Sequence, residues 1–290
     1  MTVLCFKYNL LPRVKGDVAL KTLFVSDLDG TILRSDETIS QFTIDTINEL
    51  TKRGVLFSYA TARSLVTAKK VTKGLNSHIP VIVYNGTFVM DNATEEILIA
   101  NYFDDGIEEI FCDLFKNGIY PIVYSYIDGV EKFSYIPEKC TEGMKFFLNT
   151  RKDDKRKNEV RTIEDLTAGK CFYITCIDEP EKLEPFLKKF KDRYHVVYSK
   201  DVYSDFQWLE IMPKTASKAN AVLQLKEKLC CHRIVSFGDG ENDIDMFKIS
   251  DEAYAVDNAI DDLKTVATGV IGSNDDDGVA KWLIAKTERL

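Results

Sequence analysis

The stretch Asp27-Leu-Asp-Gly-Thr31 follows directly on the apolar run Thr22-Leu-Phe-Val-Ser26, and the prediction of the fold starts from this junction. A short apolar run bounded by turn residues is typical of a buried strand, so a strand is predicted at 22–26. The two carboxylates then fall where this strand ends. Because Mg²⁺ prefers hard oxygen ligands in octahedral geometry, the pair is compatible with a magnesium site. For an isolated Asp-x-Asp-Gly motif, the alternative is a structural turn in which Gly30 supplies an unusual backbone angle.

Strands and helices alternate on both sides of a long middle segment. Residues 40–50 place apolar side chains at roughly helical spacing, and Gly54 follows as a stop signal, so this segment is predicted to be a helix. A strand over 55–60, a helix through Leu75 and a strand over 81–84 complete a β-α-β-α-β series, and a helix over 216–229 precedes a strand over 233–237. This alternation predicts a parallel sheet covered on both faces, with ligands at the carboxyl ends of its strands.

The middle segment, 88–207, has a different pattern. Aromatic residues alternate around Tyr124, and 172–177 resembles a strand, so an inserted α+β domain is predicted whose antiparallel sheet has one solvated face. The charged run 151–157 contains acids as well as bases, which favours a solvated loop or helix face over a polyanion site. The predicted organisation is an N-terminal extension at 1–17, a core made of 18–87 and 208–290, and an insert at 88–207.

Composition narrows the class of protein. The chain has 290 residues, of which 45% are hydrophobic, and its 38 basic against 46 acidic residues give a net charge of −8, which opposes binding to nucleic acid. Seven cysteines without a Cys-x-x-Cys pair indicate neither a zinc site nor a disulfide framework, so buried reduced thiols are expected. The apolar runs are too short to cross a bilayer and no secretory signal is visible, so a cytoplasmic protein is expected.

A second acidic cluster follows the strand at 233–237. If this strand neighbours the first, Asp239 can ligate a metal, while Asp243 can orient the ligands without binding the metal itself. Asp243 also stands where a dinucleotide fingerprint would need its third glycine, and the chain has no Walker A loop, which argues against both nucleotide sites. Two further groups suit a bound phosphate. One is the hydroxyl of Thr61, after the second predicted strand, and the other is the ammonium of Lys214 or Lys218, ahead of the strand at 233–237.

Taken in order, five motifs resemble the haloacid dehalogenase superfamily, specifically its Cof-type phosphatase branch. They are Asp27-Leu-Asp-Gly-Thr31, Ala60-Thr-Ala-Arg63, Asn85-Gly86, Ser217-Lys218 and Phe237-Gly-Asp-Gly-Glu-Asn-Asp-Ile-Asp-Met246. The resemblance includes Asp277-Gly-Val-Ala280 and covers nearly the whole chain after Val18. It implies an α/β fold with a Rossmann-like parallel core and an α+β cap at 88–207 that closes over the crevice and selects the substrate. The chain departs from the family pattern at Ala62 and Asp257, where glycine is common, and at residues 1–17, which have no counterpart.

The resemblance also implies a role for each motif. It implies a Mg²⁺-dependent phosphatase that hydrolyses small phosphate monoesters, commonly sugar phosphates, through an aspartyl phosphate on Asp27. Asp29 would protonate the leaving alkoxide and later activate water. Mg²⁺ would lie on the carboxylates of Asp27 and Asp239 and the carbonyl of Asp29. The phosphoryl oxygens would be held by the backbone amides of Leu28 and Ala62 and by Thr61, Lys218 and Asn242, while Asp243, Arg63 and Asn85 would support the ligands or face the substrate.

Two other functions stay open at this point. A phosphomutase of the same superfamily also forms an aspartyl phosphate, but a sugar hydroxyl takes the phosphoryl group in place of water. A receiver-like regulatory module shares the acids, the threonine and the lysine, but it lacks a counterpart to Asp29 and to the long insert. The expected partner is a small phosphate ester, with no nucleic acid and no membrane, and the expected state is a monomer or a weak homo-oligomer.

Overall fold

The computed structural model describes residues 21–76, 79–104, 106–200 and 206–287, and it divides the chain into two compact units. Unit 1 contains the chain up to Ala100 and again from Ser217, and unit 2 is Asn101–Ala216. The two junctions between the units, near residues 101 and 216, lie further along the chain than the predicted limits of the insert, residues 88 and 207. The reason is strand pairing, because 88–100 pairs with the strand before it in unit 1 and 207–212 pairs within the sheet of unit 2. The predicted extension at 1–17 lies outside the described residues.

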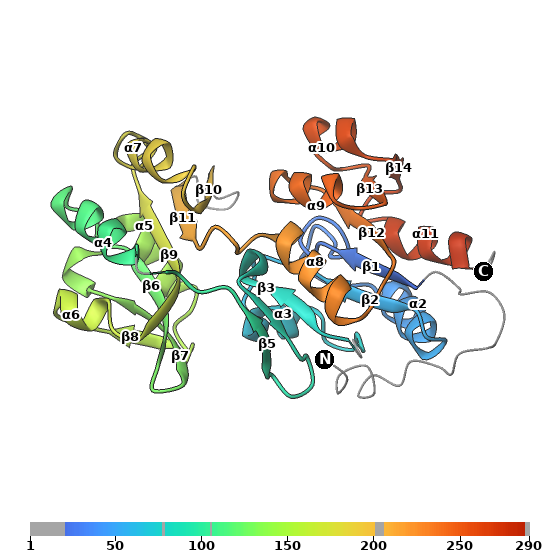
Figure 1. Ribbon diagram of the computed structural model, residues 1–290, viewed down its shortest axis with the longest axis horizontal. Helices are drawn as coiled ribbons and strands as arrows, with labels where there is room; N and C mark the ends of the chain where they lie inside the picture. Colours follow the sequence, from blue (N-terminus) through green and yellow to red (C-terminus); the bar gives the residue numbers. More distant parts are fainter. Residues whose placement is uncertain (1–20, 77–78, 105, 201–205, 288–290) are drawn as a thin grey trace. The chain divides into compact units, whose positions relative to one another are not determined.

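A parallel sheet of order β14-β13-β12-β1-β2 forms the centre of unit 1. Its strands are β1 (Thr22–Ser26), β2 (Leu56–Tyr59), β12 (Arg233–Gly238), β13 (Glu252–Val256) and β14 (Gly269–Ile271). Figure 1 shows the blue β1 beside the orange β12, so strands that lie more than 200 residues apart in the sequence are neighbours in one sheet. The α/β fold class expected from the sequence is confirmed.

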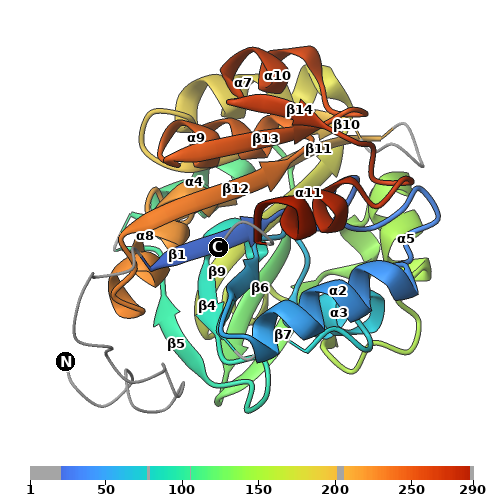
Figure 2. The same ribbon diagram turned by 90° about the vertical axis from the view of Figure 1, so that its right-hand side faces the viewer.

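Helices cover both faces of this sheet, with α2 and α11 on one face and α8 and α9 on the other (Figure 2). The indole of Trp282 packs against one ring from each of β1, β12 and β13, which buries the face under α11. α2 begins where the hydroxyl of Ser40 caps the amide of Thr43. The helices of unit 1 are α2 (Gln41–Lys52), α3 (Leu65–Val71), α8 (Lys218–Lys228), α9 (Ile244–Lys248), α10 (Asp261–Val266) and α11 (Gly278–Thr287).

A small antiparallel sheet continues unit 1 beyond β2. Its strands are β3 (Val81–Val83), β4 (Phe88–Met90) and β5 (Ile97–Ala100). β3 runs parallel to the end of β2 through a bridge between Ala60 and Ile82. The short turn η1 (Tyr84–Gly86) joins β3 to β4, and it has positive φ at all three residues.

Unit 2 is an α+β unit with a six-stranded sheet of order β10-β11-β9-β6-β7-β8, antiparallel except between β7 and β8. α4 and α7 pack on one face over a core that includes Leu114, Ile174 and Phe186. The strands are β6 (Ile122–Ile127), β7 (Val130–Tyr135), β8 (Lys157–Glu159), β9 (Lys170–Asp178), β10 (His195–Lys200) and β11 (Gln207–Met212). The helices are α4 (Ile107–Lys116), η2 (Pro137–Lys139), α5 (Glu142–Asn149), α6 (Ile163–Leu166) and α7 (Pro180–Phe190).

Two expectations for unit 2 are wrong in part. The second face of the sheet is not solvated under α5, because Phe147 of that helix packs edge-on against Phe133 and Trp208. The charged run at 151–157 is not solvated throughout, because Arg156 is buried and its guanidinium pairs with Asp154 and Glu131. Burial of a charge is tolerated here since opposite charges surround it.

The described cysteines are not uniformly buried. Cys171, Cys176 and Cys231 are buried, whereas Cys112 and Cys230 are exposed. The expectation of buried thiols therefore holds for the first three and fails for the last two. Among the described helices, none has the length and apolar character needed to span a membrane.

Candidate active site

The first acidic pair lies at the carboxyl end of β1. Asp27 is buried and its amide donates to the carbonyl of Phe237 on β12 at 2.9 Å, which joins the two strand ends. Asp29 is exposed, and the chain turns after it at Gly30, where φ is +74°. A Cβ on Gly30 would overlap the carboxylate of Asp239. Glycine is therefore required both by the backbone angle and by the closeness of the two acidic segments.

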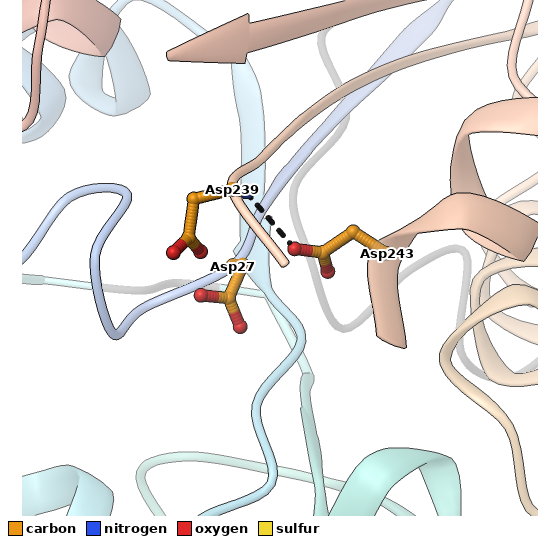
Figure 3. Close-up of side chains that lie close together, drawn as sticks. All are labelled: Asp27, Asp239 and Asp243. Carbon is orange, nitrogen blue, oxygen red and sulfur yellow. Dashed lines mark hydrogen bonds between the residues drawn. The ribbon is translucent and has the colours of Figure 1, made fainter. Parts of the chain in front are cut away.

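Three carboxylates converge at this point (Figure 3). Asp27, Asp239 and Asp243 each offer an oxygen within 4.8 Å of the others. The hydroxyl of Thr31 lies 3.4 Å from Oδ2 of Asp27 and 3.0 Å from Oδ1 of Asp239, so it bridges the first two. The second cluster meets the first because β1 and β12 are neighbours in the sheet.

Asp243 accepts hydrogen bonds from the backbone and from a lysine beside the other two carboxylates. It ends η3 (Glu241–Asp243), and its Oδ2 accepts the backbone amides of Asp239 and Gly240, both at 3.1 Å. Its Oδ1 accepts the ammonium of Lys218 at 2.8 Å. Both oxygens of Asp243 thus accept at 3.1 Å or less, whereas Oδ2 of Asp27 has only the long 3.4 Å contact with Thr31, so Asp27 and Asp239 are the better placed metal ligands.

Lys218 is the buried cation of this cluster. Its Nζ donates to Oδ1 of Asp27 at 2.5 Å and to Asp243, and it begins α8 directly after the N-cap residue Ser217. Burial lowers the pKa of Lys218, but the charges of Asp243 and Asp27 outweigh burial, so the pKa is raised overall and the ammonium stays charged. Lys214, the other candidate, belongs to unit 2, where its exposed side chain donates to the carbonyl of Asp192.

Burial and mutual repulsion raise the pKa of two carboxyl groups. Burial is the largest cause for Asp27, opposed by Lys218 and reinforced by the neighbouring acids. Burial and then the charge of Asp243 raise the pKa of Asp239 to about 6. Three carboxylates facing one ammonium leave excess negative charge, which a divalent cation would neutralise. The donors offered are all oxygens, the ligands that Mg²⁺ prefers, so the residues present fit that ion.

The carboxylate of Asp29 forms an ion pair at the edge of the site. Arg63 donates from Nε to Oδ2 of Asp29 at 2.8 Å, and its guanidinium also binds Glu37 at 2.7 Å. The hydrogen bond to Asp29 is the main cause of a raised pKa for Arg63. Sequence reasoning missed Glu37, because its approach depends on the path of the loop after β1 and no local pattern marks it.

The other predicted residues surround the same end of the sheet. Thr61 follows β2 and is fully buried, and its hydroxyl accepts the amide of Arg63 at 3.1 Å. Ala62 has no positive φ, so alanine is tolerated where glycine is usual in the family. Nδ2 of Asn242 donates to Oδ1 of Asn85 at 3.3 Å. Leu28 is buried, and its carbonyl accepts amides from the following turn.

Known proteins are similar to this chain over most of its length. The sequence profile of the haloacid dehalogenase-like hydrolases matches residues 24–283. A Streptococcus pyogenes protein provisionally named a phosphatase is 29% identical over 286 residues, covering 90% of this chain and 98% of the relative. The 5-amino-6-(5-phospho-D-ribitylamino)uracil phosphatase YitU of Bacillus subtilis is 25% identical, covering 90% and 96%. The crystal structure of a Thermotoga maritima protein, 28% identical, superposes with a TM-score of 0.74 and covers 94% of this chain and 98% of that one.

Proposed function

Because this chain belongs to the haloacid dehalogenase-like hydrolases and hydrolyses phosphoric monoesters, we propose that it is a Mg²⁺-dependent phosphatase of small esters, with sugar phosphates as its main substrates. The observation that carries this proposal is the position of Asp27. Its carboxylate is buried beside Asp239 and Asp243, and one of its oxygens is held by Lys218. A carboxylate fixed in this way is suited to act as a nucleophile, since its orientation is set before substrate binds.

In the proposed reaction, a carboxylate oxygen of Asp27 attacks phosphorus and the bond from phosphorus to the ester oxygen breaks. Asp29 gives its proton to the departing alkoxide, which leaves as an alcohol. Asp29 then takes a proton from water as that water attacks phosphorus, which releases inorganic phosphate and restores the Asp27 carboxylate. Asp29 must exchange its ion pair with Arg63 for the substrate oxygen in order to act, since both of its oxygens now accept from that guanidinium.

The phosphoryl group needs positioned donors around its three remaining oxygens, because negative charge is spread over them in the transition state. We assign this role to Thr61, Lys218, Asn242 and the amides of Leu28 and Ala62. Mg²⁺ bound by the carboxylates of Asp27 and Asp239 and the carbonyl of Asp29 would supply positive charge to the same oxygens. Unit 2 is proposed to contribute to the choice of substrate.

The nucleophile is tested by replacing Asp27 in the purified protein. The wild type is assayed with Mg²⁺ against phosphorylated sugars and nucleotides, and against the ester named for the Bacillus subtilis relative. Asp27→Asn should fold normally and lose turnover, because the change is nearly isosteric but removes the attacking oxygen. Asp45→Asn, an exposed position on α2, is the matched control. More than a trace of wild-type rate in Asp27→Asn contradicts the mechanism, and an isomerised sugar phosphate in place of free phosphate would indicate a mutase.

The requirement for Mg²⁺ is tested by removing the metal and adding back different ions. EDTA should abolish turnover and added Mg²⁺ should restore it, whereas Ca²⁺ should support it poorly because its larger and more flexible coordination misplaces the nucleophile. Initial rates with each ion are compared at matched free concentrations. Equal rates with Mg²⁺ and Ca²⁺ contradict the octahedral site, and activity that resists the chelator points to a metal-free reaction.

A further inference from the structure

The turn η1 between β3 and β4 has an unusual backbone. Tyr84, Asn85 and Gly86 have φ values of 52°, 51° and 95°, so three consecutive residues lie in the left-handed region. For a residue with a bulky side chain such as Tyr84 this region is strained, and it persists only where the surroundings hold it. Tyr84 is 4% and Asn85 1% exposed, so the surrounding protein, not solvent, determines this conformation.

Contacts of the turn lead to three segments of the candidate site. The amide of Asn85 donates to the carbonyl of Thr61 at 2.9 Å. The side-chain oxygen of Asn85 accepts from Nδ2 of Asn242 at 3.3 Å. Gly86 lies against the start of α8, where a Cβ would overlap the carbonyl of Ser217 and lie 3.0 Å from the amide nitrogen of Lys218. A single turn therefore contacts the segments that carry Thr61, Asn242 and Lys218.

We propose that Asn85 is a positioning residue that sets the spacing of these three phosphate-binding side chains, and in particular orients the amide of Asn242. This inference rests on the proposed function of the three side chains. An amide nitrogen has two protons, so when Nδ2 of Asn242 donates one to Asn85, the second stays available for a phosphoryl oxygen. Asparagine suits the position because it combines a side-chain acceptor with tolerance of the left-handed region.

Asn85→Gly isolates the side chain from the backbone. Glycine keeps the left-handed conformation and the amide that donates to Thr61, but it removes the acceptor for Asn242. In calorimetric titration of the protein with inorganic phosphate and Mg²⁺, we expect the Kd of Asn85→Gly to rise about tenfold, and kcat/KM to fall by a similar factor. Asn92→Gly, the same substitution in the following β4–β5 turn, is the matched control and should change neither.

The urea midpoint of each variant separates positioning from stability. Asn85→Gly should unfold near the wild-type midpoint, whereas Asn85→Ala, which also opposes the left-handed backbone, should unfold earlier and bind phosphate no better than Asn85→Gly. A lowered midpoint in Asn85→Gly with an unchanged phosphate Kd would show a merely structural residue and overturn the inference.

A double-mutant cycle tests the route through Asn242. If Asn85 acts by orienting that amide, the double variant Asn85→Gly/Asn242→Ala binds phosphate as weakly as Asn242→Ala alone. Losses that simply add would show that the Asn85 side chain acts independently of Asn242, which contradicts the inference. A wild type that neither binds phosphate nor turns over esters would instead overturn the proposed function, so the two failures are distinguishable.

Discussion

Asp29 is the single residue whose contacts differ most from its proposed chemistry. Arg63 donates to the Asp29 carboxylate at 2.8 Å, yet the proposed reaction needs this side chain to reach the ester oxygen and give it a proton. Arg63 has a second carboxylate partner in Glu37, so it keeps a counter-charge when Asp29 moves to the substrate. Glu37 therefore lowers the electrostatic cost of releasing Asp29.

The proposed proton transfer predicts how strongly Asp29→Asn acts. Turnover should fall about 10²–10⁴-fold, the usual range for a general acid–base, and fall further for alkyl phosphates than for p-nitrophenyl phosphate, whose leaving group needs no proton. Asp45→Asn, the exposed control on α2, should show no dependence on the leaving group. An unchanged rate of Asp29→Asn with alkyl phosphates would remove Asp29 from this role.

The sequence predicted the positions of site residues that directly follow a strand, but it did not predict contacts between residues that are brought together only by the folding of the chain. Asp27 and Asp239 each follow an apolar run directly, so local pattern places both at the same edge of the sheet. The choice of Lys218 over Lys214 rested on the family resemblance. Glu37 and Arg156 could not be assigned, because the partner of Glu37 is distant in sequence and the burial of Arg156 depends on strand pairing.

At the scale of elements, local periodicity predicted strands and helices better than it predicted domain limits. The strand at 22–26 and the helix at 216–229 agree with β1 and α8, because an apolar run or a capping residue marks each. The limits of the insert differ from the predicted ones because β4 pairs with β3 and β5 with β4 in unit 1, whereas β11 pairs with β9 and β10 in unit 2. Pairing between strands leaves no local signal in the sequence.

Strand β11 carries a carboxyl group whose titration should affect stability. Burial raises the pKa of Glu210 to about 7, opposed by a hydrogen bond from Tyr173. An acid with a higher pKa in the folded than in the unfolded state favours folding when it is protonated. The protonated Glu210 carboxyl therefore contributes fully to the free energy of unfolding below the unfolded pKa of about 4.5. This contribution is lost as pH rises through about 7.

Glu210→Gln should therefore stabilise the protein at pH 8 by about 1–3 kcal/mol and change it little at pH 5. Urea unfolding followed by far-ultraviolet circular dichroism at the two pH values measures this difference. Glu108→Gln, an exposed position on α4, should be neutral at both. An equal gain for Glu210→Gln at both pH values would show that the substitution acts through packing and not through titration.

At the scale of the whole molecule, the residues proposed for chemistry all belong to unit 1. The nucleophile, the proton donor, the metal ligands and the phosphate-binding side chains come from segments before Ala100 or after Ala216. Unit 2 has its own sheet and core, and none of the proposed catalytic groups. Chemistry and choice of substrate are thus assigned to different parts of the chain, and the two should be separable by deletion.

Deleting 101–216 and joining the flanking residues with a short linker tests this separation. The remaining unit should hydrolyse a small activated ester such as acetyl phosphate slowly, because the nucleophile and its partners are retained. Hydrolysis of the preferred sugar phosphate should collapse, because contacts with the remote part of a substrate lower the barrier to its reaction. Circular dichroism must first show that the shortened chain folds, and Asp27→Asn in that chain is the control for residual turnover. A folded deletion variant with full efficiency and unchanged preference among sugar phosphates would show that unit 2 does not select the substrate.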